Sequence, residues 1–410
     1  MILVHSYLFI SVVFVGVTFA GCNMTKTERS TIRALQLGMG WFDEQPGGLN
    51  RVYFELLRHL PEVGVEARGL VAGSAAVAEQ TCGQVLAFAL ASTPLWRRWQ
   101  GVRRETKTAL NHFPPQLVVS HFALYTYPVL GQIKVPLVVH FQGPWADEGA
   151  VEGGRGSARI IKKSVETAVY RRARRLICLS QAFAALLVER YGVDPARVRI
   201  VPGGVDAGRF EGVPDRAVAR ERLGWPQDRP IIFAVRRLVR RMGLEDLIEA
   251  MVEVRRRVPD VLLLIGGRGP LQGELTARIE QLGLTVHVRL LGYLSDEALP
   301  LAYRAADITV VPTVALEGFG LIAAESLAAG TPTLVTPVGG LPEVVRDLSA
   351  NLVLPSTGPG ALAEGLSAAL RGDMVLPDTD ACRAFAREHY DWSSIAPQVR
   401  AAYEEALQND

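Results

Sequence analysis

The sequence has few residues that could build a disulfide framework or a metal site. Its four cysteines, Cys22, Cys82, Cys178 and Cys382, are scattered without a Cys-x-x-Cys spacing, and its seven histidines form no cluster. This usage is typical of reduced thiols in a cytoplasmic protein, so we expect neither disulfides nor a bound metal. The formal net charge is only +2, which argues against the positive field of a nucleic-acid-binding protein.

Long apolar runs are also scarce. Outside the N-terminus, no stretch reaches the ~18 apolar residues that a membrane-spanning helix requires. Residues 8–20 are apolar and lead into Cys22, which resembles a bacterial lipoprotein signal, but no Lys or Arg precedes them. Because Met24 follows at once, we favour an over-long start site with translation from Met24. A lipid tether at Cys22 is the alternative.

A chain of 410 residues is too long for one ordinary hydrophobic core and indicates two domains of roughly 200 residues. Apolar residues make up 49% of the chain and charged residues 21%, as in a folded globular protein. Apolar strand patterns alternate with helical patterns, which predicts an α/β fold with two doubly wound parallel sheets facing across a cleft. We place an N-terminal extension at 1–30, the two domains at 31–215 and 225–388, and a final helix at 389–410.

The most informative segment predicts a strand, a loop and a helix in succession. An apolar, β-branched run at 308–312 is followed by a glycine-rich loop and then by good helix formers. The loop carries Glu317, and the helix carries Glu325, the only charged residue from Gly318 to Pro342. A carboxylate on a buried helix is costly unless it has a partner, and sugar hydroxyl groups are suitable partners.

The start of this helix is a candidate anion site as well. The free N–H groups at Gly320, Leu321 and Ile322 would face a phosphate at the helix N-terminus. One short segment could therefore bind three parts of a substrate. Glu317 would bind the transferring group, the helix N-terminus would bind a phosphate, and Glu325 would bind a ribose.

In the form EGFGLIAAE, the two acids and the residues between them resemble the signature of the retaining glycosyltransferases of family 4, which have the two-domain GT-B fold. The resemblance implies that Glu317 grips hydroxyl groups of the sugar and that Glu325 holds the ribose. It also implies that Gly318, Phe319, Gly320 and Leu321 line the donor site.

Other turns fit the same resemblance. Gly47 and Gly48 lie between a strand and a helix, where glycine lets the backbone approach a bound phosphate or sugar closely. Family members carry a glycine pair at the corresponding place, facing donor and acceptor. Gly267 lies in the turn after the strand at 261–265, and Leu294 lies in a loop where family members hold the base with backbone groups.

Two histidines end predicted strands, at the edge where open α/β sheets bind their ligands. His121 ends the run LVVSH, and His140 ends the run PLVVH. In the setting VVHFQGPW, His140 matches the active-site His that family members place near the transferred sugar. Either histidine alone could instead be a core or capping residue.

Four arginines at positions 236, 237, 240 and 241 follow the strand at 230–235. The positive charges of neighbouring arginines repel one another unless an anion binds between them. A diphosphate is well suited to bind there. The family pattern here is Gly-Arg-Leu and then Lys-Gly. Arg237 matches the family's Arg, but Met242 stands where the Lys is expected, so Arg241 or Arg240 is expected to supply that charge. A second departure is Gly203, which stands where Asn is usual before the domain junction.

These features predict a retaining glycosyltransferase that moves a hexose-type sugar from a nucleotide-diphosphate sugar to an acceptor hydroxyl on a glycan, a lipid or a small molecule. The resemblance implies that no metal or other cofactor takes part and that the leaving phosphate acts as the base. The alternatives are a lipid-anchored periplasmic sugar-binding protein and a GT-B sugar epimerase or phosphorylase.

Indole and guanidinium groups mix between Trp96 and Arg104, a composition that suits peripheral contact with an anionic membrane surface. The alternative is a solvated helix on which Trp96 and Trp99 pack against the core. The late acidic run at 378–380 is polar and loop-like, so a turn is predicted there rather than a metal site.

Overall fold

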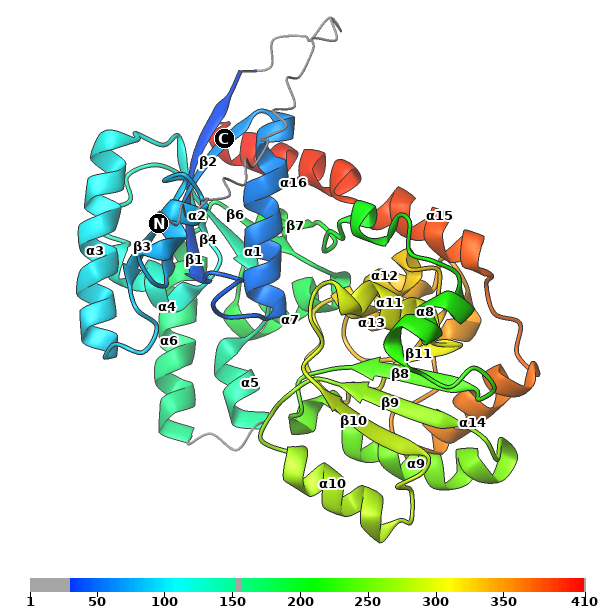
Figure 1. Ribbon diagram of the computed structural model, residues 1–410. Coiled ribbons are helices and arrows are strands. Elements are labelled where there is room, and N and C mark those ends of the chain that lie inside the picture. The colour runs from blue at the N-terminus through cyan, green and yellow to red at the C-terminus, as the bar shows by residue number, and fades with distance from the viewer. Residues whose placement is uncertain (1–29, 152–155, 409–410) are drawn as a thin grey trace, which may run out of the picture.

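The structure, a computed structural model, describes residues 30–151 and 156–408. Two lobes lie side by side (Figure 1), and each has a parallel sheet with helices packed against it. The predicted α/β class with two Rossmann-like sheets is confirmed. Residues 1–29, with the apolar run at 8–20 and Cys22, lie outside the described residues.

The first sheet has seven strands in the spatial order β3-β2-β1-β4-β5-β6-β7, all parallel. Its strands are β1 (Ile32–Gly40), β2 (Val65–Ala72), β3 (Val85–Ala89), β4 (Leu117–Ser120), β5 (Leu137–Phe141), β6 (Arg175–Cys178) and β7 (Val198–Ile200). Its helices are α1 (Gly48–His59), α2 (Ala76–Gln80), α3 (Leu95–His112), α4 (Ala123–Thr126), α5 (Trp145–Val151), α6 (Gly156–Arg172) and α7 (Gln181–Tyr191).

The second sheet has five parallel strands in the order β10-β9-β8-β11-β12. Its strands are β8 (Ile231–Val235), β9 (Leu262–Gly266), β10 (Val288–Gly292), β11 (Ile308–Val311) and β12 (Thr333–Val335). The helices that follow the first sheet are α8 (Arg216–Leu223), α9 (Leu244–Arg257), α10 (Gln272–Gln281), α11 (Ala298–Ala305), α12 (Leu321–Ala328), α13 (Leu341–Val345), α14 (Pro359–Arg371), α15 (Thr379–Tyr390) and α16 (Trp392–Leu407). Short 3₁₀ turns include η2 (Tyr127–Val129), η4 (Ala207–Phe210) and η5 (Arg240–Met242).

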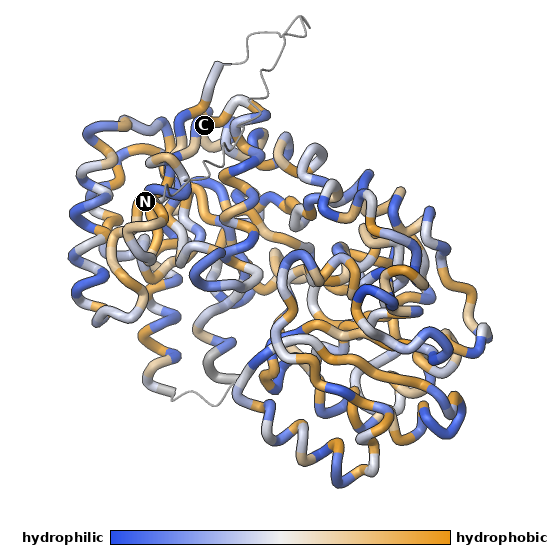
Figure 2. The backbone as a smooth tube through the Cα atoms, in the orientation of Figure 1, coloured by the Kyte–Doolittle hydropathy of each residue, from blue (hydrophilic) through white to orange (hydrophobic). Residues whose placement is uncertain are grey.

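Both sheets reverse their winding direction once, between β1 and β4 in the first and between β8 and β11 in the second. At such a switch point the loops after the two strands run to opposite faces of the sheet, which is where open α/β sheets bind ligands. The central strands β4 and β5 of the first sheet and β8, β9 and β11 of the second are mostly apolar and buried, and apolar segments run through the middle of both lobes (Figure 2), because helices cover both faces of a doubly wound sheet.

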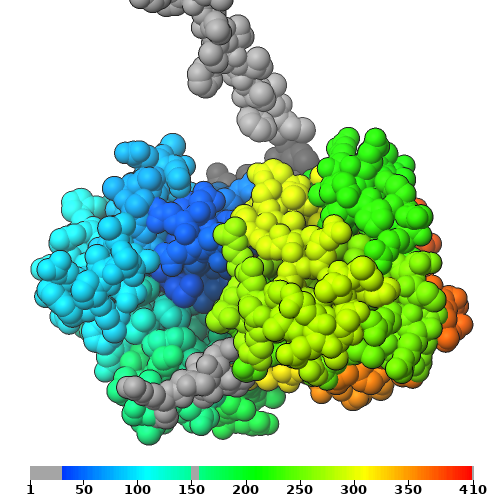
Figure 3. Space-filling model, turned by 60° about the horizontal axis from the view of Figure 1, so that its bottom comes forward, coloured from blue at the N-terminus to red at the C-terminus, as the bar shows by residue number. Residues whose placement is uncertain are grey.

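The last two helices connect the lobes. Tyr390 of α15 belongs to the core of the second domain, whereas Trp392, Val399 and Tyr403 of α16 pack into the core of the first. Asp391 marks the crossing and caps α16, because its carboxylate accepts from the backbone N–H of Ser393 at 2.9 Å. The chain therefore returns to the lobe in which it started, and the two lobes abut along a long boundary (Figure 3).

The prediction of a turn at 378–380 is wrong. Asp378 is the N-cap of α15, and its side chain accepts from the backbone N–H of Ala381 at 2.8 Å. Capping acids look like loop residues in a sequence, because they are polar and stand just before the apolar pattern begins. None of the helices in the described ranges combines the length and the apolar character needed to cross a membrane.

Candidate active site

The switch point of the second sheet holds a buried ion pair. Arg236 follows β8, and Glu317 lies in the loop after β11, so the parallel strands bring both to one edge of the sheet. The Arg236 guanidinium donates to the Glu317 carboxylate and to the Thr313 hydroxyl. The two charged side chains are 7% and 15% exposed, so this pair is largely shielded from water.

Burial would raise the pKa of Glu317, but the Arg236 guanidinium, the nearby charge of Arg241 and the Thr313 hydroxyl hold that pKa below its ordinary value. Glu317 is therefore a carboxylate at neutral pH. An ionised carboxylate can only accept hydrogen bonds, so it is suited to bind hydroxyl groups.

Close backbone contacts fix the Glu317 loop. The N–H of Gly340 donates to the carbonyl oxygen of Glu317 at 3.0 Å. A Cβ at Gly339, where φ is +57°, would lie 2.0 Å from the same oxygen. Only glycine fits at position 339, so the turn after β12 is built to hold the loop that carries Glu317.

The four loop arginines point in different directions. Arg240 turns to the surface and pairs with Glu274 at 2.9 Å, whereas Arg241 is buried and donates to the Leu316 carbonyl at 3.1 Å. Arg241 also lies 3.5 Å from the carboxylate of Glu148 on α5, which belongs to the first domain. Of the two residues expected to replace the family's Lys, Arg241 is thus the one beside Glu317.

Arg237 is exposed at the start of the same loop, and Met242 is buried in the core of the second domain. A lysine ammonium at position 242 would need a partner in that apolar environment. The departure from the family pattern thus fits the packing around this residue.

Glu325 lies one turn into α12 and is 5% exposed. The Tyr303 hydroxyl of α11 donates to its carboxylate at 2.8 Å. Burial raises the pKa of Glu325, and the charges of Arg51 and Arg209 and the Tyr303 hydrogen bond oppose that rise.

The N-terminus of α12 packs at the junction of the domains. Gly320 precedes the helix with φ of +92°, and the side chain of Leu321 contacts the cores of both domains. A Cβ at Gly203 would lie 2.8 Å from the side chains of Phe319 and Leu321. This contact explains why glycine rather than Asn occupies position 203, since the EGFGL loop lies directly against it.

His140 lies at the carboxyl end of β5 and is 5% exposed. Its Nε2 is 3.1 Å from the Tyr403 hydroxyl of α16, and its ring stacks on that of His121 with the centroids 4.6 Å apart. His121 Nε2 lies 2.8 Å from Gln36 Oε1. Burial lowers the pKa of His140 to about 3, so this imidazole is neutral and acts as a hydrogen-bonding group rather than as a cation.

The predicted glycines occupy two places. Gly47 and Gly48 are exposed, and a Cβ at either would meet no atom within 4 Å, so the loop before α1 is open to a ligand. Gly267 lies against β8: its φ is +132° and a Cβ there would be 1.8 Å from the Arg236 carbonyl oxygen. Leu294 packs on the neighbouring Gly266.

The structure thus brings Glu317, Arg241, Gly267 and Leu294 around the end of the second sheet, with Gly318 to Leu321 and Glu325 on the adjoining loop and helix. His140 lies at the end of the first sheet instead, and Gly47 and Gly48 lie in the loop between β1 and α1. Sequence reasoning missed four residues with contacts at these places: Arg236, Thr313, Tyr303 and Arg51. Arg236 was within the arginine run, but the sequence could not tell which arginine turns inward. Among the residues that the structure describes, no three His, Cys, Asp or Glu side chains form a group able to hold a metal ion.

Two family models match the chain. Residues 46–209 match the family described as Glycosyltransferase Family 4, and residues 215–389 match Glycosyl transferases group 1. The D-inositol 3-phosphate glycosyltransferase of Salinispora arenicola is 32% identical over 378 residues, which cover 84% of this chain and 79% of the relative.

Other relatives match over a shorter length or in structure alone. The phosphatidyl-myo-inositol mannosyltransferase of Mycobacterium leprae is 33% identical over 218 residues, which cover 53% of this chain and 55% of the relative. The crystal structure of Anabaena HepE in complex with UDP and glucose has a TM-score of 0.75 and 20% sequence identity, and the match covers 91% of this chain and 99% of that one. At this level of identity the structural likeness supports the fold.

Proposed function

Because this chain belongs to family 4 of the glycosyltransferases, we propose that it moves a hexose-type sugar from a nucleotide-diphosphate sugar to an acceptor hydroxyl, with retention at the anomeric carbon and without a metal ion. The observation that carries the proposal is the convergence of Arg236, Arg241 and Glu317 at the switch point of the second sheet. The family and the named relatives are glycosyltransferases, which argues against the alternatives of a sugar-binding protein, an epimerase and a phosphorylase.

The diphosphate of the donor binds against Arg237, Arg241 and the first N–H groups of α12. The N–H groups of Leu321 and Ile322 have no carbonyl one turn earlier in the helix, so they are free to face an anion. Guanidinium and N–H groups then offset the charge that grows on the departing phosphate. Such preorganised donors contribute of order 3 kcal/mol each to the stability of a transition state. That support takes the place of a metal ion.

The sugar and the ribose bind to the two acids. Glu317 accepts hydrogen bonds from sugar hydroxyl groups, and its ion pair with Arg236 keeps it ionised. Glu325 accepts from the ribose. His140 approaches the sugar from the first domain: its Nε2 faces the Tyr403 hydroxyl, which leaves Nδ1 for the substrate.

In the transfer itself, the bond between the anomeric carbon and the phosphate oxygen breaks, and a bond to the acceptor oxygen forms on the same face of the sugar. The proton of the acceptor hydroxyl goes to the departing phosphate. No side chain is then needed as a nucleophile, and the protein acts through position and charge.

A donor screen tests this function. The protein is incubated with UDP-, GDP- and ADP-sugars, and binding is followed by thermal shift and turnover by released nucleotide. Because the relatives named above act on inositol phosphate and phosphatidyl-inositol, myo-inositol phosphates and phosphatidylinositol are the first acceptors to test. One donor is expected to raise the Tm and to release its nucleotide faster when an acceptor is added. Release of nucleotide from none of the donors with any acceptor would contradict the proposal.

Glu325→Gln is expected to weaken binding of the matching nucleoside diphosphate by about tenfold to a hundredfold, because a neutral amide replaces an acceptor that binds the ribose as an anion. The binding of the wild type should also weaken as the pH falls through the raised pKa of Glu325, since the carboxylate is lost below it. The Gln variant should lack that pH dependence. Calorimetry from pH 5 to pH 8 measures both, and Glu364→Gln, at an exposed acid of α14, is the control.

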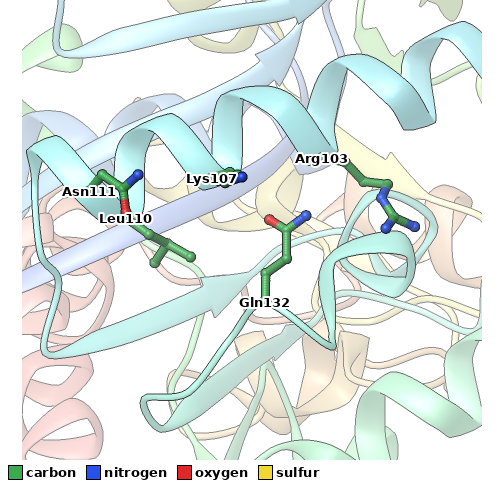
Figure 4. Close-up of a pocket in the computed structure, with 5 residues that line it drawn as sticks. All are labelled: Arg103, Lys107, Leu110, Asn111 and Gln132. Atoms are coloured by element: carbon green, nitrogen blue, oxygen red, sulfur yellow. The ribbon is translucent and has the colours of Figure 1, made fainter.

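A second part of the proposal concerns the membrane. Trp96 on α3 is 56% exposed, with the Arg97 guanidinium 5.0 Å from its ring centroid, whereas Trp99 is half-buried against Tyr127. Further along the same helix, Arg103 and Lys107 line an open pocket together with Leu110, Asn111 and Gln132 (Figure 4). We propose that this face of α3 rests on an anionic bilayer, with Trp96 at the headgroup level and the basic side chains beside lipid phosphates.

Trp96→Ala is expected to reduce cosedimentation with phosphatidylcholine–phosphatidylglycerol vesicles several-fold, because the interfacial indole and its contact with the Arg97 guanidinium are lost together. Vesicles of phosphatidylcholine alone should bind poorly in either case, since each basic residue near an anionic surface contributes ~1 kcal/mol. Arg256→Ala, on the exposed face of α9 in the second domain, should change nothing. Equal binding of the wild type to both kinds of vesicle would argue against the surface.

A further inference from the structure

Arg51 reaches from the first domain into the second. It lies on α1, three residues after Gly48, and its side chain is 15% exposed. The guanidinium pairs with the Asp296 carboxylate in the loop after β10. It also lies 4.2 Å from the ring centroid of Phe42, in the loop before α1. The side chain thus spans the junction between the first domain, near the Gly47–Gly48 loop, and the second domain, in which the nucleotide sugar is proposed to bind.

Arg51 is also one of the charged groups around Glu325, and its positive charge lowers the pKa of that carboxyl. The titratable groups that face this carboxylate come from three helices and a loop: Arg51 of α1, Arg209 of η4, Tyr303 of α11 and Asp296 in the loop after β10. The two arginines lower the pKa of Glu325, and Asp296 raises it. Among the described residues, the Tyr303 hydroxyl is the one hydrogen-bond donor to Glu325. A buried carboxylate with a single neutral donor depends on nearby positive charge to stay ionised.

Arg209 is the other cation near Glu325, and it comes from the segment that joins the two domains. Its guanidinium donates to the Asp296 carbonyl at 3.2 Å and lies 3.8 Å from the Asp296 carboxylate. Asp296 therefore holds both cations in place. Of the two, only Arg51 belongs to the sheet-bearing part of the first domain, so only Arg51 would leave Glu325 if the lobes moved apart.

We propose that Arg51 is a positioning residue that completes the ribose site only when the two domains are together, by pairing with Asp296 and placing its charge beside Glu325. The inference rests on the proposed role of Glu325 in ribose binding. Domain closure and nucleotide binding then support each other, because each is favoured in the state in which the other is present. The same closure brings the Gly47–Gly48 loop, three residues before Arg51, toward the donor.

The experiment measures the binding of UDP, GDP and ADP to the full-length protein by calorimetry from pH 5 to pH 8. The variants are Arg51→Met, Arg51→Lys and Asp296→Asn. Arg51→Met is expected to weaken binding of the matching nucleotide about tenfold at pH 7, and to move the pH midpoint of binding upward. One pKa unit corresponds to a tenfold change in the ratio of the two protonation states. Arg51→Lys, which keeps the charge, should recover most of the midpoint and less of the affinity.

Arg58→Met is the matched control, because Arg58 lies on the same helix and, like Arg51, pairs with Glu55, but makes no contact with Asp296 among the described residues. It should leave affinity and midpoint unchanged. Asp296→Asn should weaken nucleotide binding less than Arg51→Met, since it releases the guanidinium without removing it, and it should not move the pH midpoint upward, because the Asp296 carboxylate itself raises the pKa of Glu325. In the Glu325→Gln background, Arg51→Met should change the nucleotide affinity little further, because the carboxylate on which the Arg51 charge acts is already absent.

The outcomes separate two failures. If Glu325→Gln binds every nucleotide as the wild type does, the ribose role of Glu325 is wrong. If Glu325→Gln loses binding while Arg51→Met keeps the wild-type affinity and pH midpoint, the ribose role stands and the inference about Arg51 is overturned. A loss of affinity in Arg51→Met without any midpoint shift would also overturn it, because a merely structural role would produce that result. If Arg51→Met does not fold, Arg51→Gln, which also removes the charge, takes its place and the same two criteria apply.

Discussion

Glu317→Gln is expected to lower kcat by about 100- to 1,000-fold while changing the affinity for the free nucleotide much less. The Gln side chain is isosteric, but it cannot accept hydrogen bonds from sugar hydroxyl groups as an anion, and loss of one preorganised group of this kind costs of order 3 kcal/mol in the transition state. Glu317 faces the sugar in the proposal, so UDP, GDP or ADP alone should not sense the change. Steady-state release of nucleotide measures kcat, and calorimetry measures the affinity.

The variant also leaves Arg236 buried without its counter-ion. Removing one partner of a buried pair destabilises a protein by ~3–5 kcal/mol, so the Tm must be followed together with activity. Glu274→Gln, which removes a surface partner of Arg240, is the matched control. A folded Glu317→Gln variant with wild-type kcat would show that this acid does not act on the sugar.

Arg241→Met is expected to lower kcat by about 100-fold and to weaken nucleotide diphosphate binding by about tenfold. Methionine fills much of the same volume, but the charge that offsets the departing diphosphate is lost. A nucleoside monophosphate should bind with nearly unchanged affinity, because the charge acts near the distal phosphate. The comparison of mono- and diphosphate affinities therefore separates a charge effect from a general loss of structure.

Arg240→Met is the control for this experiment, since it removes a neighbouring guanidinium that faces Glu274 and Glu245 on the surface. It should keep wild-type kcat and affinity. Arg237→Ala should resemble Arg241→Met, because it matches the family's arginine and lies in the same loop. If Arg240→Met loses activity and Arg241→Met does not, the arginine roles proposed here are reversed.

Much of the local structure around the candidate site was predictable because its signals are local. The strand, loop and helix that carry Glu317 and Glu325 follow one another within a short stretch, so propensity and glycine placement were enough to order them. The two parallel sheets were predictable for a similar reason, since apolar runs and helical patterns alternate regularly. The turn predicted at 378–380 failed because a helix cap and a loop share the same polar residues.

The rest depended on contacts between distant parts of the chain. Arg236 and Arg237 are adjacent and chemically identical, and only the pairing of β8 with β11 decides which of them meets Glu317. His140 lies near the carboxyl end of its strand, one residue before the end at Phe141, but its hydrogen bond to Tyr403 joins residues 263 positions apart. No sequence pattern of either segment points to the other.

By itself, the sequence determined the class of fold, the family and the short acidic segment, because these follow from periodicity and from residues close together in the chain. Only the tertiary structure decided which arginines turn inward, that Arg51 reaches across to Asp296, and that Glu325 is buried beneath Tyr303. The physical reason is that side-chain direction and charge state depend on the packing of elements far apart in sequence, and burial rather than residue type sets the cost of each charge.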